Sequence, residues 1–165
     1  MAAGATYEKI ATTTLGSNQT TVTFTSISQS YTDLIIIVNA GASAATANGG
    51  FRFNSDTGNN YSQTTIRANG GAVGSASISS NSQINLDYWG FTTSVTNMEI
   101  IQIQNYSNTT TYKTVLIRGD SADYGVKASV GLWRSTSAIT RIDIKSDAVN
   151  FITGSTFTIY GIAAA

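Results

Sequence analysis

Histidine, cysteine and proline are all missing from this chain of 165 residues, which has only nine basic and nine acidic side chains. Without histidine and cysteine, a Ser-His-Asp triad, a Cys-His dyad, a haem site and a zinc site with nitrogen or sulfur ligands are excluded. A disulfide framework is excluded too, and thiol content gives no indication of the redox compartment. Ser, Thr, Asn, Gln and Gly occupy the polar positions instead. This composition favours binding and assembly over catalysis.

The charged side chains balance to a formal net charge of zero, and Lys and Arg occur singly without forming a basic patch. Nucleic acid and anionic membranes are therefore not expected as partners. A chain without net charge also lacks the repulsion that keeps soluble proteins apart, which favours an oligomer. We expect no signal peptide or membrane span, because Met1 to Lys9 lacks a hydrophobic region and the apolar run Leu34 to Val38 is too short.

Short β-branched or aromatic runs alternate with clusters of Gly, Asn, Ser and Asp along the whole chain, a pattern typical of all-β sandwiches. We predict a single antiparallel β-sandwich domain over residues 1–165, jelly-roll-like, with about 8–11 strands. Residues 1–6 and 163–165 are expected to be short flexible ends. The predicted strands cover residues 7–11, 20–24, 34–40, 51–54, 64–68, 83–89, 98–106, 112–118, 126–133, 139–145 and 156–162.

Local patterns add detail to these strands. Val126, Ala128, Val130 and Leu132 alternate with polar residues, which predicts that they form the dry face of their strand. The run 34–38 is apolar on both faces, as in a central strand or one covered by another subunit. The apolar phase changes between Ile100 and Ile101, which a β-bulge would explain.

The pair Asn69-Gly70 predicts a tight primed hairpin turn, in which both central residues have positive φ.

The strand edges of this protein are expected to have little protection. Proline and charge are two means by which sheets protect exposed edges, and this chain uses little of either. A closed jelly roll, or an oligomer whose neighbours cover the edges, would resolve this difficulty.

Carboxylates are the remaining groups for acid-base chemistry. Asp120 and Asp123 share a loop, and Asp143 and Asp147 flank the end of a predicted strand. Loop capping and solubility explain both pairs, so we predict no catalytic residues and no enzyme activity.

The segment that contains Asn54, Asp56 and Asn60 resembles the first half of a calcium loop. The match is incomplete, because Gly58 stands where a ligand belongs and no bidentate Glu follows. An Asx-type turn explains the same residues. We therefore predict no metal ion and no cofactor, with Asn54, Asp56 and Asn60 as a weak calcium candidate.

Four aromatic residues are candidates for contact with an interface or a glycan: Tyr61, Tyr88, Trp89 and Trp133. Rings beside Asn and Asp can stack on sugars or anchor a protein interface, although core packing is the alternative. Trp89 and Trp133 fall on the phase opposite to the apolar stripes of their strands, which predicts an outward orientation.

Several segments together resemble a β-rich domain that is common in virion proteins of tailed bacteriophages. They are Thr21 to Ile27, Tyr31 to Leu34, Phe53 to Ser62, Asn105-Tyr106, Trp133 to Ile142 and Asn150 to Ile162. The more specific parts are Tyr-Thr-Asp-Leu and the closing Gly-Ser-x-x-x-x-Tyr-Gly-Ile. The resemblance covers about Ile10 to Ile162 and implies a jelly-roll-like sandwich displayed on the virus particle, usually as an oligomer and commonly as a trimer.

Two roles are compatible with this resemblance: a decoration (cement) protein bound to the outer capsid, and a receptor-binding tip of a tail or head fibre that contacts a host surface glycan. The compact chain, in which we expect no anchoring segment or shaft, favours decoration. The predicted partners are then other copies of this chain, as a homotrimer, and the major capsid protein of the same virion. The expected location is the capsid exterior, after synthesis in the host cytoplasm.

Overall fold

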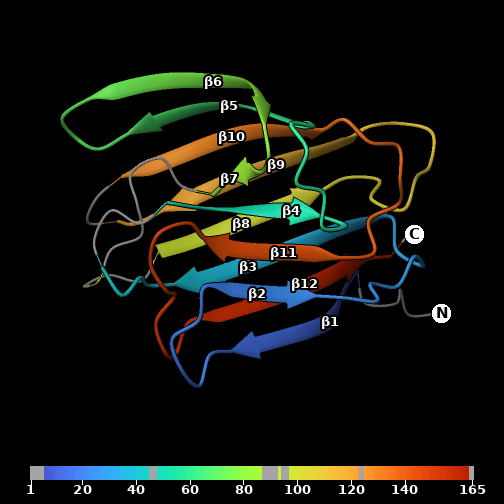
Figure 1. The fold of residues 1–165 in the computed structure, drawn as a ribbon, viewed down its shortest axis with the longest axis horizontal. Helices are drawn as coiled ribbons and strands as arrows, with labels where there is room; N and C mark the ends of the chain where they lie inside the picture. Colours follow the sequence, from blue (N-terminus) through green and yellow to red (C-terminus); the bar gives the residue numbers. More distant parts are fainter. Residues whose placement is uncertain (1–5, 45–47, 87–92, 94–96, 123–124, 164–165) are drawn as a thin grey trace.

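The computed structural model describes residues 6–44, 48–86, 93, 97–122 and 125–163. These residues form two antiparallel sheets and contain no helix, hence none that could cross a membrane. The sheets lie face to face, and the smaller one is in front in Figure 1. The predicted all-β sandwich is confirmed, whereas its jelly-roll connectivity stays a prediction.

The large sheet has eight strands and the small sheet has four. In spatial order the large sheet contains β1 (Tyr7–Thr14), β12 (Thr156–Ile162), β3 (Asp33–Ala40), β8 (Asn97–Ile103), β9 (Lys113–Asp120), β10 (Val126–Trp133), β5 (Tyr61–Ala68) and β6 (Val73–Asn81). The small sheet contains β2 (Thr21–Phe24), β11 (Ile142–Ser146), β4 (Gly49–Phe53) and β7 (Ile84–Asn85).

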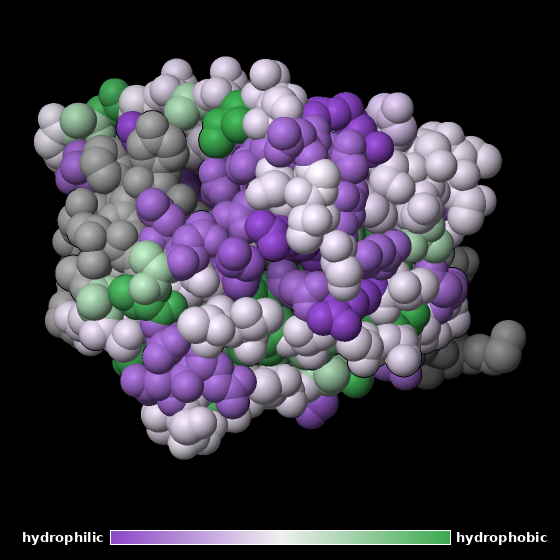
Figure 2. All heavy atoms as spheres, in the orientation of Figure 1, coloured by the Kyte–Doolittle hydropathy of each residue, from purple (hydrophilic) through white to green (hydrophobic). Residues whose placement is uncertain are grey.

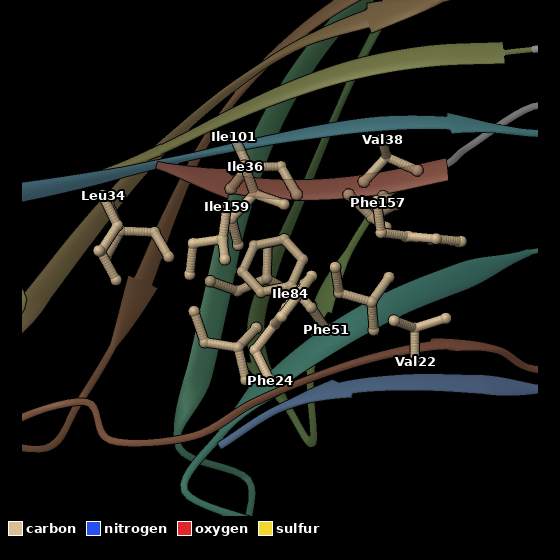
Figure 3. Packing of buried hydrophobic residues seen from close by; sticks show 14 of the residues in the cluster. Val22, Phe24, Leu34, Ile36, Val38, Phe51, Ile84, Ile101, Phe157 and Ile159 are labelled. Atoms are coloured by element: carbon tan, nitrogen blue, oxygen red, sulfur yellow. The ribbon is translucent and has the colours of Figure 1, made fainter. Parts of the chain in front are cut away.

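The hydrophobic core fills the space between the two sheets. Side chains from alternate positions of each strand point into it, so every second residue of β12 is buried. Figure 3 shows the interdigitation, in which Val38, Phe157 and Ile159 of the large sheet face Val22, Phe24 and Phe51 of the small one.

The strand β3 explains the run that is apolar on both faces. Its inward residues Leu34, Ile36 and Val38 are fully buried, and it lies between β12 and β8. Ile35 and Ile37 lie on the opposite face of the sheet, where Ile35 is also buried. The predicted position in the interior of a sheet is confirmed.

The β-bulge predicted between Ile100 and Ile101 is wrong. The register of β8 with β3 is continuous from Leu34↔Ile103 to Ala40↔Asn97. Burial alternates regularly, with Glu99 and Ile101 inside and Met98 and Ile100 outside. The apparent change of phase arose because an acidic side chain occupies a core position.

The hairpin between β5 and β6 lies where Asn69-Gly70 predicted a turn, but its tip is displaced by one residue. Asn69 N–H donates to the Ala72 carbonyl at 3.1 Å, and Asn69 Oδ1 accepts from Ala72 N–H at 3.0 Å. Gly70 and Gly71 therefore form the tip, with Gly70 at φ 79°. The strand that follows, β6, was not among those predicted.

Candidate interaction surface

Two continuous rows of side chains cross the outer face of the large sheet, the face turned away from the small sheet. One row runs across β3, β8, β9, β10 and β5 in the order Ile37, Ile100, Arg118, Ala128 and Ile66. The next row follows the order Ile35, Gln102, Leu116, Val130 and Thr64. Seven of these ten residues are apolar, so the outer face is a broad hydrophobic surface.

The outer face is most exposed along β10, β5 and β9. Ile66 is 61% exposed, Val130 51% and Leu116 37%. Together with Thr64, Gln102 and Arg118 they line an open depression of about 400 Å³. A flat apolar surface with a shallow hollow suits contact with another protein better than enclosure of a small molecule.

The prediction that Val126, Ala128, Val130 and Leu132 form the dry face of β10 is wrong, because the strand is oriented the other way round. Val126, Ala128 and Val130 are exposed on the outer face, whereas Lys127 and Ser129 are buried between the sheets. Each polar residue has a partner there, since Ser129 Oγ lies 2.8 Å from Thr65 Oγ1 and Lys127 Nζ lies 2.7 Å from Glu99 Oε1.

A glycine makes the ion pair between Glu99 and Lys127 possible. These residues lie on β8 and β10, which are separated by β9, and Gly119 stands between them in the same row. A Cβ at Gly119 would lie 2.8 Å from Glu99 Oε2, so a side chain there would enter the space that the carboxylate occupies. The two charged side chains are each 2% exposed and form a polar link within the sandwich.

Trp133 points inward, contrary to its predicted outward orientation, because it follows the reversed phase of β10. The side chain is 2% exposed and stacks on Tyr61 with ring centroids 6.3 Å apart, and Tyr61 is fully buried. Burial raises the pKa of Tyr61 to about 12. Neither ring is available to a ligand at the surface. Tyr88 and Trp89, the other two aromatic candidates, lie outside the described residues.

Asp56 ties the loop after β4 to the core. Its carboxylate accepts hydrogen bonds from Gly58 N–H at 2.8 Å, from Asn60 Nδ2 at 2.9 Å and from the Trp133 indole at 2.8 Å. The contact with Gly58 is an Asx turn, the alternative considered for this calcium candidate.

Asn54, the first residue of the calcium candidate, fastens the same loop to the segment before β11. Its Oδ1 accepts from Thr140 N–H and Arg141 N–H, and its Nδ2 donates to the Ala138 carbonyl. The side-chain oxygens of Asn54 and Asp56 that calcium would need thus accept hydrogen bonds from protein donors. Among the described residues no three His, Cys, Asp or Glu side chains are grouped to hold a metal ion.

Replacement of Asp56 by Asn is expected to weaken the dependence of stability on pH at acid pH. Burial alone would raise the pKa of Asp56, but the hydrogen bonds from Trp133, Asn60 and Gly58 outweigh it and lower the pKa below 3.8. A group with a depressed pKa stabilises the fold above its unfolded value, and that contribution is lost as pH falls through the folded value. Urea unfolding of both proteins between pH 2 and 7 measures the effect; equal pH profiles would contradict it.

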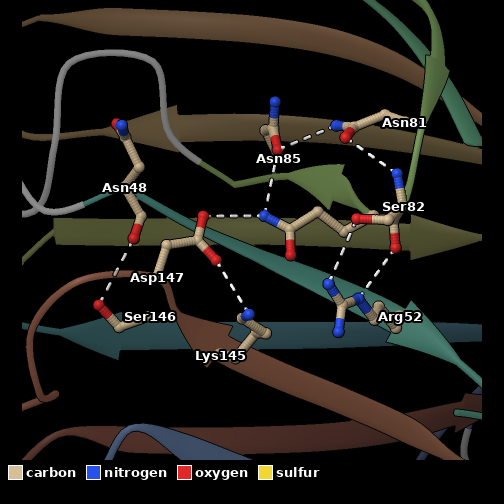
Figure 4. A network of polar contacts seen from close by, with 9 residues as sticks. Asn48, Arg52, Asn81, Ser82, Asn85, Lys145, Ser146 and Asp147 are labelled. Atoms are coloured by element: carbon tan, nitrogen blue, oxygen red, sulfur yellow. Dashed lines mark hydrogen bonds and ion pairs between the residues drawn. The ribbon is translucent and has the colours of Figure 1, made fainter. Parts of the chain in front are cut away.

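The outer surface of the small sheet is polar, in contrast to the outer face of the large sheet. Figure 2 shows hydrophilic residues gathered over its centre, where β4 and β11 lie. Asp147 accepts from Gln83 Nε2 at 2.9 Å and pairs with Lys145 at 3.2 Å, while Arg52 donates to the Ser82 carbonyl (Figure 4). Arg52, Gln83, Lys145 and Asp147 are thus held in place by polar contacts across the small sheet.

Asp143, one of the carboxylates considered for acid-base chemistry, is held in the ionised form. Arg141 and Thr23 donate to Asp143, and these bonds outweigh burial and hold its pKa below the usual range. A general acid needs the opposite shift. Asp120 is buried and accepts from Ser121 N–H, whereas Asp123 lies outside the described residues.

The exposed apolar residues Ile66, Leu116 and Val130 were not recognised from the sequence as a surface. One signal in the sequence could have indicated which way β10 faces. Glu99 and Lys127 have opposite charges, and each lies on the same face of its strand as a buried residue, Ile101 and Trp133 respectively. The strand β6 also carried a signal, since Ala76 and Ile78 alternate with serines at a period of two.

Comparison of the chain with protein-family models, with curated proteins and with solved structures gave no match.

Proposed function

We propose that this protein is a non-enzymatic structural protein of a tailed-bacteriophage virion, a decoration protein that binds the outer surface of the capsid. The outer face of the large sheet carries the proposal, because five adjacent strands present apolar side chains there with Arg118 as the one charged residue in its two rows. The likeness of several segments to β-rich virion domains supplies the viral context. The partner is the major capsid protein.

The chemistry of the outer face fits such a contact. Burial of Ile66, Leu116 and Val130 against a capsid subunit removes apolar area from water, which is the main favourable term in protein association. Arg118 lies in the middle of the surface, and no acidic side chain pairs with it among the described residues. We expect the capsid surface to offer a carboxylate opposite Arg118, since an unpaired buried charge is costly.

The size of the outer face limits how tightly one copy can bind. Five strands spaced about 4.8 Å apart and about 26 Å long present roughly 600 Å². A standard interface takes about 800 Å² from each partner. One outer face therefore gives a modest contact, and a decoration protein of this kind gains from acting as an oligomer with several contacts to the lattice.

The number of copies in each virus particle tests the role. Quantitative mass spectrometry of purified particles is expected to find hundreds of copies, in constant proportion to the major capsid protein. A few to some tens of copies would overturn decoration in favour of a fibre that binds a receptor.

A second experiment tests the face. The double variant Ile66→Lys and Val130→Lys places charge on two exposed apolar positions and is expected to leave the fold intact while the protein is lost from the capsid. The matched control, Thr21→Lys and Thr57→Lys, adds the same charge at exposed positions by the small sheet and should still bind. Equal loss from both variants would contradict docking through the outer face.

A further inference from the structure

In the part of the chain that the structure describes, the two sheets have four edge strands, and three of these edges are protected. The small sheet ends in β2, with four residues, and β7, with two, and such short edges pair poorly with another chain. The large sheet ends on one side in β1, which carries Glu8 and Lys9 and has a register shift between Lys9 and Ala11. Charge and a bulge both discourage pairing.

The fourth edge, β6, has none of these protections along most of its length. It has nine residues, Val73–Asn81, without charge or proline. Its register with β5 is regular from Ala68↔Val73 to Gln63↔Ile78, and the one irregularity lies beyond Ile78. Figure 1 shows β6 at the margin of the sheet, with no labelled strand beyond it.

The side chains of β6 also permit close approach by another strand. Ser75 and Ser77 are exposed on the outer face, and Ala76 between them is small. Val73, at the start of the strand, is 87% exposed, more than any other large apolar residue described. The strand thus offers an uncharged row of main-chain donors and acceptors with an apolar residue at its end.

We propose that β6 pairs with β6 of a second copy of this chain, antiparallel about a two-fold axis. A two-fold contact brings the same surface of each copy together, so the surface must be complementary to itself. An uncharged strand meets this condition because no like charges come opposite one another. Serines near the axis can exchange hydrogen bonds across the two strands, and Val73 would be covered by the far end of the partner strand.

The pairing would join two large sheets into one continuous sheet with both outer faces on the same side. Such a dimer would contact the capsid at two adjacent points. This consequence rests on the proposed function, whereas the pairing itself does not. Once two copies pair, neither β6 edge is free to pair again, so this contact gives a dimer. The resemblance to virion domains had led us to expect a trimer.

The mass of the purified chain in solution tests the pairing without a capsid. Light scattering during gel filtration at about 100 µM, well above a Kd in the low micromolar range, is expected to give twice the 17.3 kDa of one chain. The double variant Ser75→Lys and Ser77→Lys should give the mass of one chain. The control, Thr12→Lys and Thr14→Lys, puts the same charge on exposed positions of β1 and should remain dimeric.

Single cysteines identify the contact, since the chain has no cysteine of its own. Ser75→Cys and Ser77→Cys lie on the proposed contact strand, and oxidation is expected to give a disulfide-linked dimer in at least one of them. Thr14→Cys on β1 should give none.

Three results would overturn the proposal: a wild-type mass of one or three chains, a dimer that survives the lysines on β6, or equal cross-linking through β1. Each can occur whether or not the protein binds a capsid, so failure of the pairing is distinguishable from failure of the proposed function.

Discussion

Replacement of Lys127 by Met is expected to lower the free energy of unfolding by about 3–5 kcal/mol, because it leaves the Glu99 carboxylate between the sheets without its ammonium partner. Both side chains are 2% exposed, so water cannot replace the lost charge. Urea denaturation monitored by tryptophan fluorescence measures the change.

Two further variants separate the effect of burial from that of charge. Lys145 pairs with Asp147 at 3.2 Å, but these side chains are 28% and 35% exposed, so Lys145→Met is expected to cost less than about 1 kcal/mol. The double variant Glu99→Gln and Lys127→Met removes both charges and should recover most of the stability. A loss for Lys127→Met no larger than that for Lys145→Met would show that the pair is not buried.

Replacement of Trp133 by Ala is expected to cost about 3–5 kcal/mol, the usual range for removal of a large buried aromatic side chain. The change opens a cavity beside Phe53 and Tyr61, whose rings pack on the indole, and removes the hydrogen bond to Asp56. Urea denaturation again gives the value.

The matched control lies three residues away on the same strand. Val130→Ala truncates a side chain that is 51% exposed on the outer face, and surface changes of this kind usually shift stability by less than about 0.5 kcal/mol. If the apolar alternation alone decided which face of β10 is inside, Val130→Ala would be the more damaging substitution. The order of the two losses therefore tests the orientation of the strand.

Much of the fold could be predicted because its signals are local. Alternation and turn residues indicated eleven strands, and β3 was placed in the interior of a sheet. The strand β6 was missed because its alternating side chains, mostly Ser, Ala and Gly, give little contrast in hydropathy. It forms because β5, its partner in the hairpin, supplies hydrogen-bond partners for its backbone, which the hydropathy of its own residues does not indicate.

The candidate surface could not be predicted, for a related reason. A period of two predicts that one face of β10 is inside and leaves open which one. Hydropathy predicted Val126, Ala128 and Val130 as the buried residues. Lys127 can be buried instead because Glu99 forms an ion pair with it across Gly119. Similarly, Trp133 faces inward where Asp56, Tyr61 and Phe53 meet it.

The sequence by itself determined that this chain is an all-β protein, and its lack of histidine and cysteine excluded the chemistries that depend on those side chains. It also indicated that strand edges would have little protection by charge or proline. Among the described strands, β6 is the one edge that lacks such protection. Only the tertiary structure decided which residues are core and which are surface, because the cost of burying a charge or an aromatic ring depends on partners brought by other strands. As a result, Val126, Ala128 and Val130, which we expected to be buried, lie on the outer face through which we propose that the protein binds the capsid.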